Sequence, residues 1–197
     1  RRKAGEIPDT LILLEHPPVI TIGKRGTNAD VLISPEKLTA EGVELYETNR
    51  GGEVTYHGPG QIVGYLIFDV SEHGKDLHQF VHSLEQVFID LLKEEYGIQA
   101  GRDPEYTGVW VGNGKITAIG IAVRKWVTMH GFAFNVATNL DHFSLIVPCG
   151  IRNREVTSLN KLITSPADMS AVQEQIIDYF LKIYRFTTWE EKQIQPA

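Results

Sequence analysis

The apolar residues of this chain fall mainly into short segments bounded by glycine, proline or polar clusters, a pattern typical of β-strands. Segment 61–70 is apolar almost throughout, which predicts a strand buried on both faces. Segment 43–49 alternates apolar and polar residues, which predicts a half-buried strand. Segment 109–123 contains Asn113-Gly114, whose residues suit a tight two-residue turn, so a β-hairpin is expected there. The other expected strands are 11–16, 19–23, 130–136 and 145–151.

Three segments are expected to form helices. Residues 34–42 carry capping signals at both ends, with serine and proline at the start and glycine at the end. A longer helix is expected between Asp76, its cap, and Gly97, because apolar residues recur there every three or four positions. A last helix is expected over 169–183, capped by Ser165-Pro166.

Strands and helices are mixed without regular β-α-β alternation, which indicates the α+β class. The 197 residues suffice for one well-buried core, so a single domain over 1–197 is expected, with a mixed sheet and flanking helices. The chain begins with Arg1 rather than methionine, and we expect that an upstream N-terminal segment is missing.

The composition excludes several classes of protein. The net charge of -6 argues against non-specific nucleic-acid binding, which needs a cationic surface. No run of eighteen apolar residues is present, so no membrane span is expected. The single cysteine, Cys149, cannot form an intrachain disulfide, which fits a reducing compartment such as the cytoplasm. His78 and His82 share a helix face, but the surrounding residues lack a zinc-protease pattern, so an exposed flank and no metal are expected.

The stretch from Arg50 to Gln61, RGGEVTYHGPGQ, lies between two expected strands and contains four glycines. So many glycines indicate either a long irregular loop or a backbone that passes close to a ligand. Arg50 has a planar guanidinium that suits a carboxylate or phosphate, although a surface charge remains the alternative. His57 is either a core histidine bonded to a carbonyl or a functional imidazole.

Cys149 stands between Pro148 and Gly150, in an expected turn where a thiol can be presented to a cavity. An isolated thiol is only a few per cent ionised near neutral pH, so a catalytic cysteine needs a neighbouring cation or base. Lys115 and His130 are the candidates that the sequence offers for that neighbour.

Four motifs occur in one order: RGGEVTYHGPGQ (50–61), KITAIG (115–120), HGFAFNV (130–136) and IVPCGI (146–151). Together they resemble the octanoyltransferases of lipoate biosynthesis, and the resemblance covers about residues 11–160. It implies a fold like that of lipoate and biotin protein ligases. It further implies that Cys149 carries the acyl group as a thioester, that Lys115 lowers the pKa of this thiol, and that no cofactor is needed.

The same resemblance implies a set of substrate-binding residues in three of the motifs. They are Arg50, Gly51, Gly52, Glu53, Val54, Thr55, Tyr56, His57, Ala118, Ile119, Gly120, Gly131, Phe132 and Ala133. Either Lys115 or His57 would act as the base for the attacking lysine.

The implied reaction moves an octanoyl group from octanoyl-acyl carrier protein to a lysine of lipoyl domains. The implied acceptors are the E2 subunits of 2-oxoacid dehydrogenases and the H protein of glycine cleavage, with the enzyme acting as a monomer. These partners are acidic, so basic pairs such as Arg124-Lys125 and Arg152 with Arg154 are candidate docking residues. Two alternatives stay open: an ATP-dependent lipoate ligase on the same fold, and a non-catalytic acyl-binding module.

Overall fold

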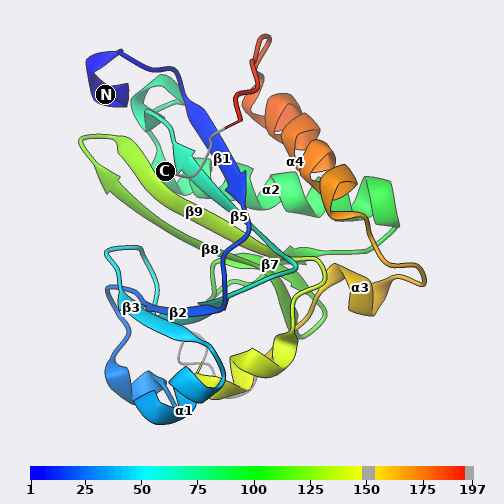
Figure 1. Cartoon of the computed structure of the whole chain (residues 1–197). Coiled ribbons are helices and arrows are strands. Elements are labelled where there is room, and N and C mark those ends of the chain that lie inside the picture. Colours follow the sequence, from blue (N-terminus) through cyan, green and yellow to red (C-terminus); the bar gives the residue numbers. More distant parts are fainter. Residues whose placement is uncertain (148–153, 194–197) are drawn as a thin grey trace.

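The computed structural model of the chain describes residues 1–147 and 154–193. A seven-stranded sheet and a three-stranded sheet form its framework (Figure 1). The larger sheet, called the main sheet below, has the order β1-β5-β9-β8-β7-β6, and all of these neighbours are antiparallel. Its strands are β1 (Thr10–Leu14), β5 (Gln61–Ile67), β6 (Gly101–Arg102), β7 (Gly108–Val111), β8 (Gly114–Arg124) and β9 (Val127–Asn135). A short strand, β10 (Glu155–Val156), pairs with β8 in parallel, so the sheet is mixed, as expected.

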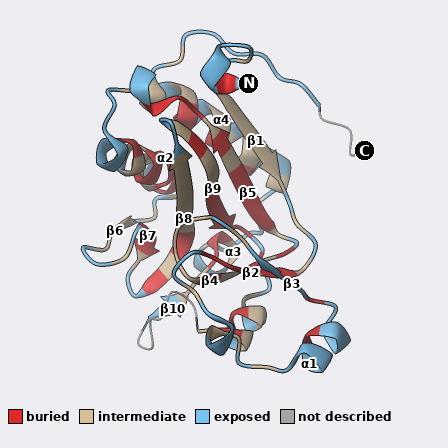
Figure 2. Ribbon diagram, turned by 90° about the vertical axis from the view of Figure 1, so that its left-hand side faces the viewer, coloured by how far each residue is buried: buried red, intermediate tan, exposed pale blue. Residues whose placement is uncertain are grey.

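Two long helices, α2 (Leu77–Tyr96) and α4 (Met169–Tyr184), cover one face of the main sheet (Figure 1). The buried apolar residues of both helices pack with Ile62, Leu66 and Phe132 in the larger hydrophobic core. Figure 2 marks buried positions in red along β5 and β9. Asp76 caps α2 through its carboxylate, which accepts a hydrogen bond from the Gln79 amide at 3.0 Å. The predicted cap of α2 is therefore confirmed.

The predicted cap of the last helix is wrong. The Asp168 carboxylate, and not Ser165-Pro166, caps α4 by accepting a hydrogen bond from the Ala171 amide at 2.9 Å. Residues before Asp168 lie outside the helix because the first unpaired helical amides are satisfied by this carboxylate. A short helix, α3 (Leu159–Leu162), precedes this segment.

The smaller sheet has the order β3-β2-β4 and, with α1 (Pro35–Ala40), surrounds a second hydrophobic cluster. Its strands are β2 (Val19–Ile22), β3 (Glu44–Glu47) and β4 (Val54–His57). The strand β3 is exposed at all four positions, whereas the sequence predicted a half-buried strand. The reason is that β3 lies at the edge of a small sheet.

Two local predictions need correction. The β7–β8 hairpin turns at Gly112-Asn113 rather than Asn113-Gly114, because Gly112 takes the positive φ, 57°, and β8 already begins at Gly114. The strand expected over 145–151 is also wrong where the structure describes it. Leu145 ends the 3-10 helix η4 (Leu140–Leu145), and Ile146 makes only an isolated bridge with Val31.

Three further 3-10 turns complete the described elements: η1 (Arg2–Ala4), η2 (Asn28–Asp30) and η3 (Val70–Glu72). Within residues 1–147 and 154–193, no helix has the length and apolar character needed to cross a membrane. His78 and His82 are exposed on α2, as expected.

Candidate active site

The face of the main sheet that points away from α2 and α4, called the site face below, carries small side chains at its centre. Strand alternation and register place two rows of cross-strand partners on it. These rows are Val63–Ala133–Ala118 and Tyr65–Gly131–Gly120. Four of the six positions are therefore alanine or glycine, which leaves the backbone close to whatever covers this face.

The same alternation directs two of the predicted site residues away from the site face. Phe132 packs in the larger core, with its ring centroid 4.7 Å from that of Phe88. A Cβ on Gly64 would come within 2.1 Å of the Phe132 ring, so the phenylalanine occupies the space beside this glycine. Ile119 packs against the same core. Contiguous motif residues thus face opposite sides of the sheet.

The glycine-rich loop, residues 48–53 between β3 and β4, lies against the site face. The Gly51 amide donates a hydrogen bond to the Ile121 carbonyl at 3.3 Å. A Cβ on Gly51 would meet that carbonyl oxygen at 2.8 Å, and a Cβ on Gly120 would meet the Gly51 oxygen at 2.7 Å. Gly52 has a φ of 87°, in the left-handed region. Glycine is therefore required where the two backbones touch.

The guanidinium of Arg50 holds this loop to β2. It donates to the Thr21 hydroxyl at 3.0 Å, to the Thr21 carbonyl at 2.5 Å and to the carbonyls of Gly51 and Glu53 at 3.0 and 2.8 Å. All four hydrogen bonds go to atoms of the protein itself. They therefore hold the loop in its conformation and do not bind a ligand. The carboxylate of Glu53 lies 3.5 Å from Arg25 Nε.

Strand β4 divides its residues between two environments. Val54 and Tyr56 are buried in the smaller hydrophobic cluster, and the Tyr56 hydroxyl bonds to His142 Nδ1 at 2.8 Å. Thr55 and His57 alternate with them along the strand and are only partly buried. Of the predicted histidine and tyrosine, only His57 is thus directed away from that cluster.

The imidazole of His57 is bound to the first residue of β5. Its Nδ1 lies 2.8 Å from Gln61 Oε1. Burial lowers the pKa of His57 to about 4, the charges of Arg50 and His16 act in the same direction, and the Gln61 hydrogen bond opposes the shift. The ring is therefore neutral near pH 7.

Two further residues near His57 were not singled out from the sequence. His16 Nε2 lies 2.5 Å from the Tyr65 hydroxyl, and the rings of His16 and His57 are 5.7 Å apart. Tyr65 also contacts His130, at a ring separation of 6.5 Å. Burial lowers the pKa of both His16 and His130. A lone tyrosine in the otherwise apolar segment 62–67 was the available signal.

His130, on β9, also contacts the glycine-rich loop. Its φ is 62°, and its Nε2 lies 2.6 Å from Asn49 Oδ1 in the glycine-rich loop. His130 thus joins β9 to this loop.

Lys115 lies at the start of β8, where β7 and β10 flank it. Its Nζ donates a hydrogen bond to the Thr107 carbonyl at 3.2 Å and lies 4.8 Å from the centre of the Trp110 ring. Its carbonyl accepts a hydrogen bond from the Thr157 amide at 3.0 Å. Lys115 therefore lies beside the strand to which the chain returns after segment 148–153.

The predicted nucleophile, Cys149, lies outside the described residues. On one side of the segment, the Val147 amide donates to the Asp30 carbonyl at 2.8 Å. On the other side, Arg154 bonds to Asp103 at 2.5 Å and to Asn113 Oδ1 at 3.0 Å, the latter at the turn just before β8.

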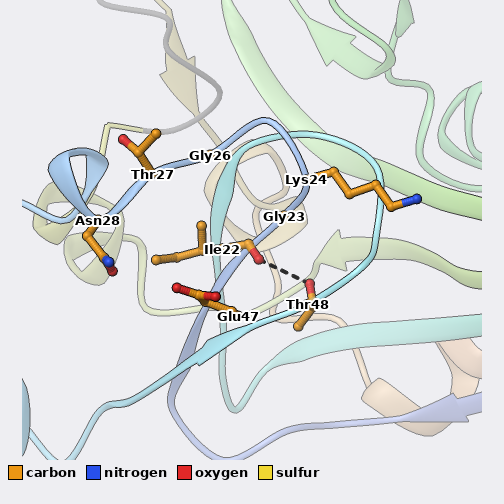
Figure 3. Close-up of a pocket in the computed structure, with 8 residues that line it drawn as sticks. All are labelled: Ile22, Gly23, Lys24, Gly26, Thr27, Asn28, Glu47 and Thr48. Carbon is orange, nitrogen blue, oxygen red and sulfur yellow. Dashed lines mark hydrogen bonds between the residues drawn. The ribbon is translucent and has the colours of Figure 1, made fainter.

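A pocket of about 380 Å³ lies at the C-terminal end of β2, between residues 22–28 and the end of β3 (Figure 3). Polar groups of Lys24, Asn28 and Thr48 line it, and the Thr48 hydroxyl bonds to the Ile22 carbonyl at 3.3 Å. None of the predicted site residues lines this pocket. In the part of the chain that the structure describes, no cluster of histidine, cysteine and carboxylate side chains could hold a metal ion.

The fold is that of the protein ligases for lipoate and biotin. A solved lipoate-protein ligase A bound with ATP matches with a TM-score of 0.78 and 19% identity, over 96% of this chain and 78% of that one. A biotin protein ligase from Aquifex aeolicus, solved with biotin and ATP, matches with a TM-score of 0.56 and 16% identity, over 84% of this chain and 70% of that one. At such identities the likeness concerns the fold alone, and it confirms the predicted class.

Sequence comparison identifies the family. Residues 1–181 match the lipoyl protein ligase A/B catalytic domain. An octanoyltransferase of Caldicellulosiruptor saccharolyticus is 61% identical over 93% of this chain and 78% of the relative. The chain therefore belongs to the lipoyl protein ligase A/B family and, within it, to the octanoyltransferases. The resemblance stated from its motifs is confirmed, and the protein is a transferase.

Proposed function

We propose that this protein transfers an octanoyl group from octanoyl-acyl carrier protein to a specific lysine of lipoyl domains, through a thioester on Cys149. The observation that carries the proposal is the 61% identity to an octanoyltransferase in a chain that retains both Cys149 and Lys115. The proposed acceptors are lipoyl domains of 2-oxoacid dehydrogenase E2 subunits and the glycine cleavage H protein.

In the first step, the Lys115 ammonium favours the thiolate of Cys149. The thiolate attacks the thioester carbonyl and forms a new sulfur–carbon bond, the carbon–sulfur bond of the donor breaks, and the phosphopantetheine thiolate takes the proton of the Lys115 ammonium as it leaves. The pairing of Lys115 with Val156 supports this assignment, because it brings the lysine strand beside the chain that follows segment 148–153.

In the second step, the neutral amine of the acceptor lysine attacks the acyl-enzyme. The carbon–nitrogen bond forms, the amine loses a proton, and Cys149 leaves as the thiolate. We propose Lys115, in its neutral form, as the base that takes this proton. The buried His57 is too weak a base for that role, because its pKa of about 4 would not let it keep the proton near neutral pH. Exchange of a thioester for an amide is downhill, so no nucleotide is required.

The small residues of the site face suit an alkyl chain. Ala118 and Ala133 provide a low apolar floor, and the glycine-rich loop, whose Gly51 covers Gly120, provides a wall. Each methylene that leaves water there would contribute about 0.8 kcal/mol. We propose that the octanoyl chain lies along this floor, with its thioester near Lys115.

The alternative that the fold favours is ATP-dependent ligation of free octanoate, since a lipoate ligase shares the fold. The two reactions are separated by supplying a lipoyl domain with octanoyl-acyl carrier protein without nucleotide, or with octanoate, ATP and magnesium. We expect modification only with the carrier-protein donor, and its loss in Cys149→Ala. Efficient modification from octanoate and ATP that persists in Cys149→Ala would establish ligation instead.

A further inference from the structure

Two buried amides connect β9 and β5 on the site face. Asn135 and Gln61 are cross-strand partners, and their side chains are 4% and 1% exposed. Asn135 Nδ2 lies 3.0 Å from the Thr157 carbonyl. A carbonyl oxygen can only accept a hydrogen bond, so the orientation of the Asn135 amide is determined. Its Oδ1 therefore faces Gln61 as an acceptor.

The orientation of Gln61 follows from the same reasoning. Its Nε2 donates to Asn135 Oδ1 at 2.8 Å and to the Tyr56 carbonyl at 3.3 Å, which uses both of its hydrogens. Its Oε1 is then the atom that lies 2.8 Å from His57 Nδ1. Since Oε1 can only accept, Nδ1 of His57 carries the proton. In the neutral ring, Nε2 carries the lone pair.

We propose that Gln61 and Asn135 are positioning residues that hold His57 in its Nδ1-protonated tautomer, so that Nε2 accepts a hydrogen bond from the attacking amine of the acceptor lysine. The proposal rests on the proposed function. A fixed acceptor near an amine orients the nitrogen lone pair toward the thioester carbonyl. This orientation raises the rate of attack, and His57 does not have to take up a proton. The hydrogen bonds that join His57, Gln61 and Asn135, called the amide relay below, continue to the Thr157 carbonyl. The Thr157 amide in turn bonds to the Lys115 carbonyl.

The charged and titratable groups around His57 favour its neutral form. The ring of His16 lies 5.7 Å away, and the guanidinium of Arg50 acts on His57 from the glycine-rich loop. Both disfavour an imidazolium, in which Nε2 would become a donor and could no longer accept. The relay and these neighbours therefore act together to preserve the acceptor.

The direct test is nitrogen NMR of the histidine rings in the full chain at neutral pH, with His57 assigned by its loss in His57→Gln. We expect the Nδ1-protonated tautomer. In Gln61→Leu we expect a mixture of tautomers, and a kcat for transfer from acyl-enzyme to lipoyl domain lowered about tenfold, the equivalent of one hydrogen bond. Asn135→Ala should have a smaller effect, because the Tyr56 carbonyl still orients Gln61.

A matched control is Gln175→Leu on α4, which removes a partly buried hydrogen bond from Tyr96 of α2, away from the site face. It should leave the tautomer and kcat unchanged. In Gln61→Glu, the carboxylate should stabilise the imidazolium, so the acid limb of the transfer profile should move to higher pH. This variant serves if Gln61→Leu does not fold.

An Nε2-protonated His57 in the unaltered chain would overturn the proposal, as would a Gln61→Leu variant with unchanged tautomer and kcat. The tautomer is measured without any acyl substrate. Failure of the relay is therefore distinguishable from failure of the proposed function, which would appear as absence of acyl transfer with the tautomer intact.

Discussion

Gly120 of β8 and Gly51 of the glycine-rich loop touch through their backbones, and a Cβ on Gly120 would come within 2.7 Å of the Gly51 carbonyl oxygen. Because that atom belongs to the backbone, it cannot move without the loop. The contact therefore sets the distance between the loop and the floor of the site face.

Gly120→Ala should displace the loop, lower the stability by about 1–3 kcal/mol and reduce octanoyl transfer. Urea unfolding and a transfer assay measure the two effects. Gly101→Ala is the control, because a Cβ at Gly101 meets nothing within 4 Å and its φ is not positive. Equal stability and transfer in both variants would disprove the role of the contact.

Arg50→Lys should also loosen the loop. An ammonium cannot reproduce the planar fork that reaches Thr21, Gly51 and Glu53, so partly buried carbonyls lose their donor, at a cost of about 1–3 kcal/mol. The control is Arg25→Lys, whose side chain is 72% exposed. Urea unfolding should separate the two variants, and an Arg50→Lys curve that matches the unaltered chain would contradict this account.

Asp9 predicts a pH-dependent part of the stability. Burial opposes its ionised form, but hydrogen bonds from His73 and Arg2 outweigh burial and hold the pKa of Asp9 below its ordinary value of 3.8. Its contribution is thus present above that value and is lost as the pH falls through the folded-state pKa.

Asp9→Asn should therefore lower the free energy of unfolding by about 1.5–3 kcal/mol at pH 7, because Arg2 and His73 lose this carboxylate while Glu72 still pairs with Arg2. The difference from the unaltered chain should shrink in acid below pH 3.8. Glu6→Gln, in an exposed pair with Arg1, should change little at either pH. A pH-independent difference for Asp9→Asn would refute the linkage.

Lys115→Met should raise the pH at which Cys149 is alkylated, because the neighbouring ammonium that favours the thiolate is lost. The rate of iodoacetamide labelling as a function of pH measures it. Lys93→Met, on the exposed side of α2, is the control. If the labelling profile of Lys115→Met matched that of the unaltered chain, Lys115 would not be the group that activates Cys149.

The sequence predicted the architecture well, because short apolar segments mark the strands and a recurrence of apolar residues every three or four positions marks the helices. Segments 11–16, 61–70 and 77–96 accordingly became β1, β5 and α2. The prediction failed where a single hydrogen bond determines the end of an element. The carboxylate of Asp168, rather than the expected Ser165-Pro166, caps α4. The edge position of β3 depends on sheet order, which alternation within one segment does not contain.

The site was predictable only as a set of motifs. Strand alternation separates Phe132 from Gly131 and Ala133, so a contiguous motif does not line one surface. The pairing of His16 with Tyr65 joins positions 49 residues apart, and no local pattern encodes it. The amide relay likewise depends on the register of β5 and β9.

The central claim is that Cys149 carries the octanoyl group. Intact-mass analysis of the chain after mixing with octanoyl-acyl carrier protein tests it directly, because Cys149 is the only cysteine. We expect one octanoyl adduct that hydroxylamine removes, that disappears on adding a lipoyl domain, and that is absent in Cys149→Ala. A folded sample with a reduced thiol and no adduct, in which the lipoyl domain is nevertheless octanoylated, would contradict the account.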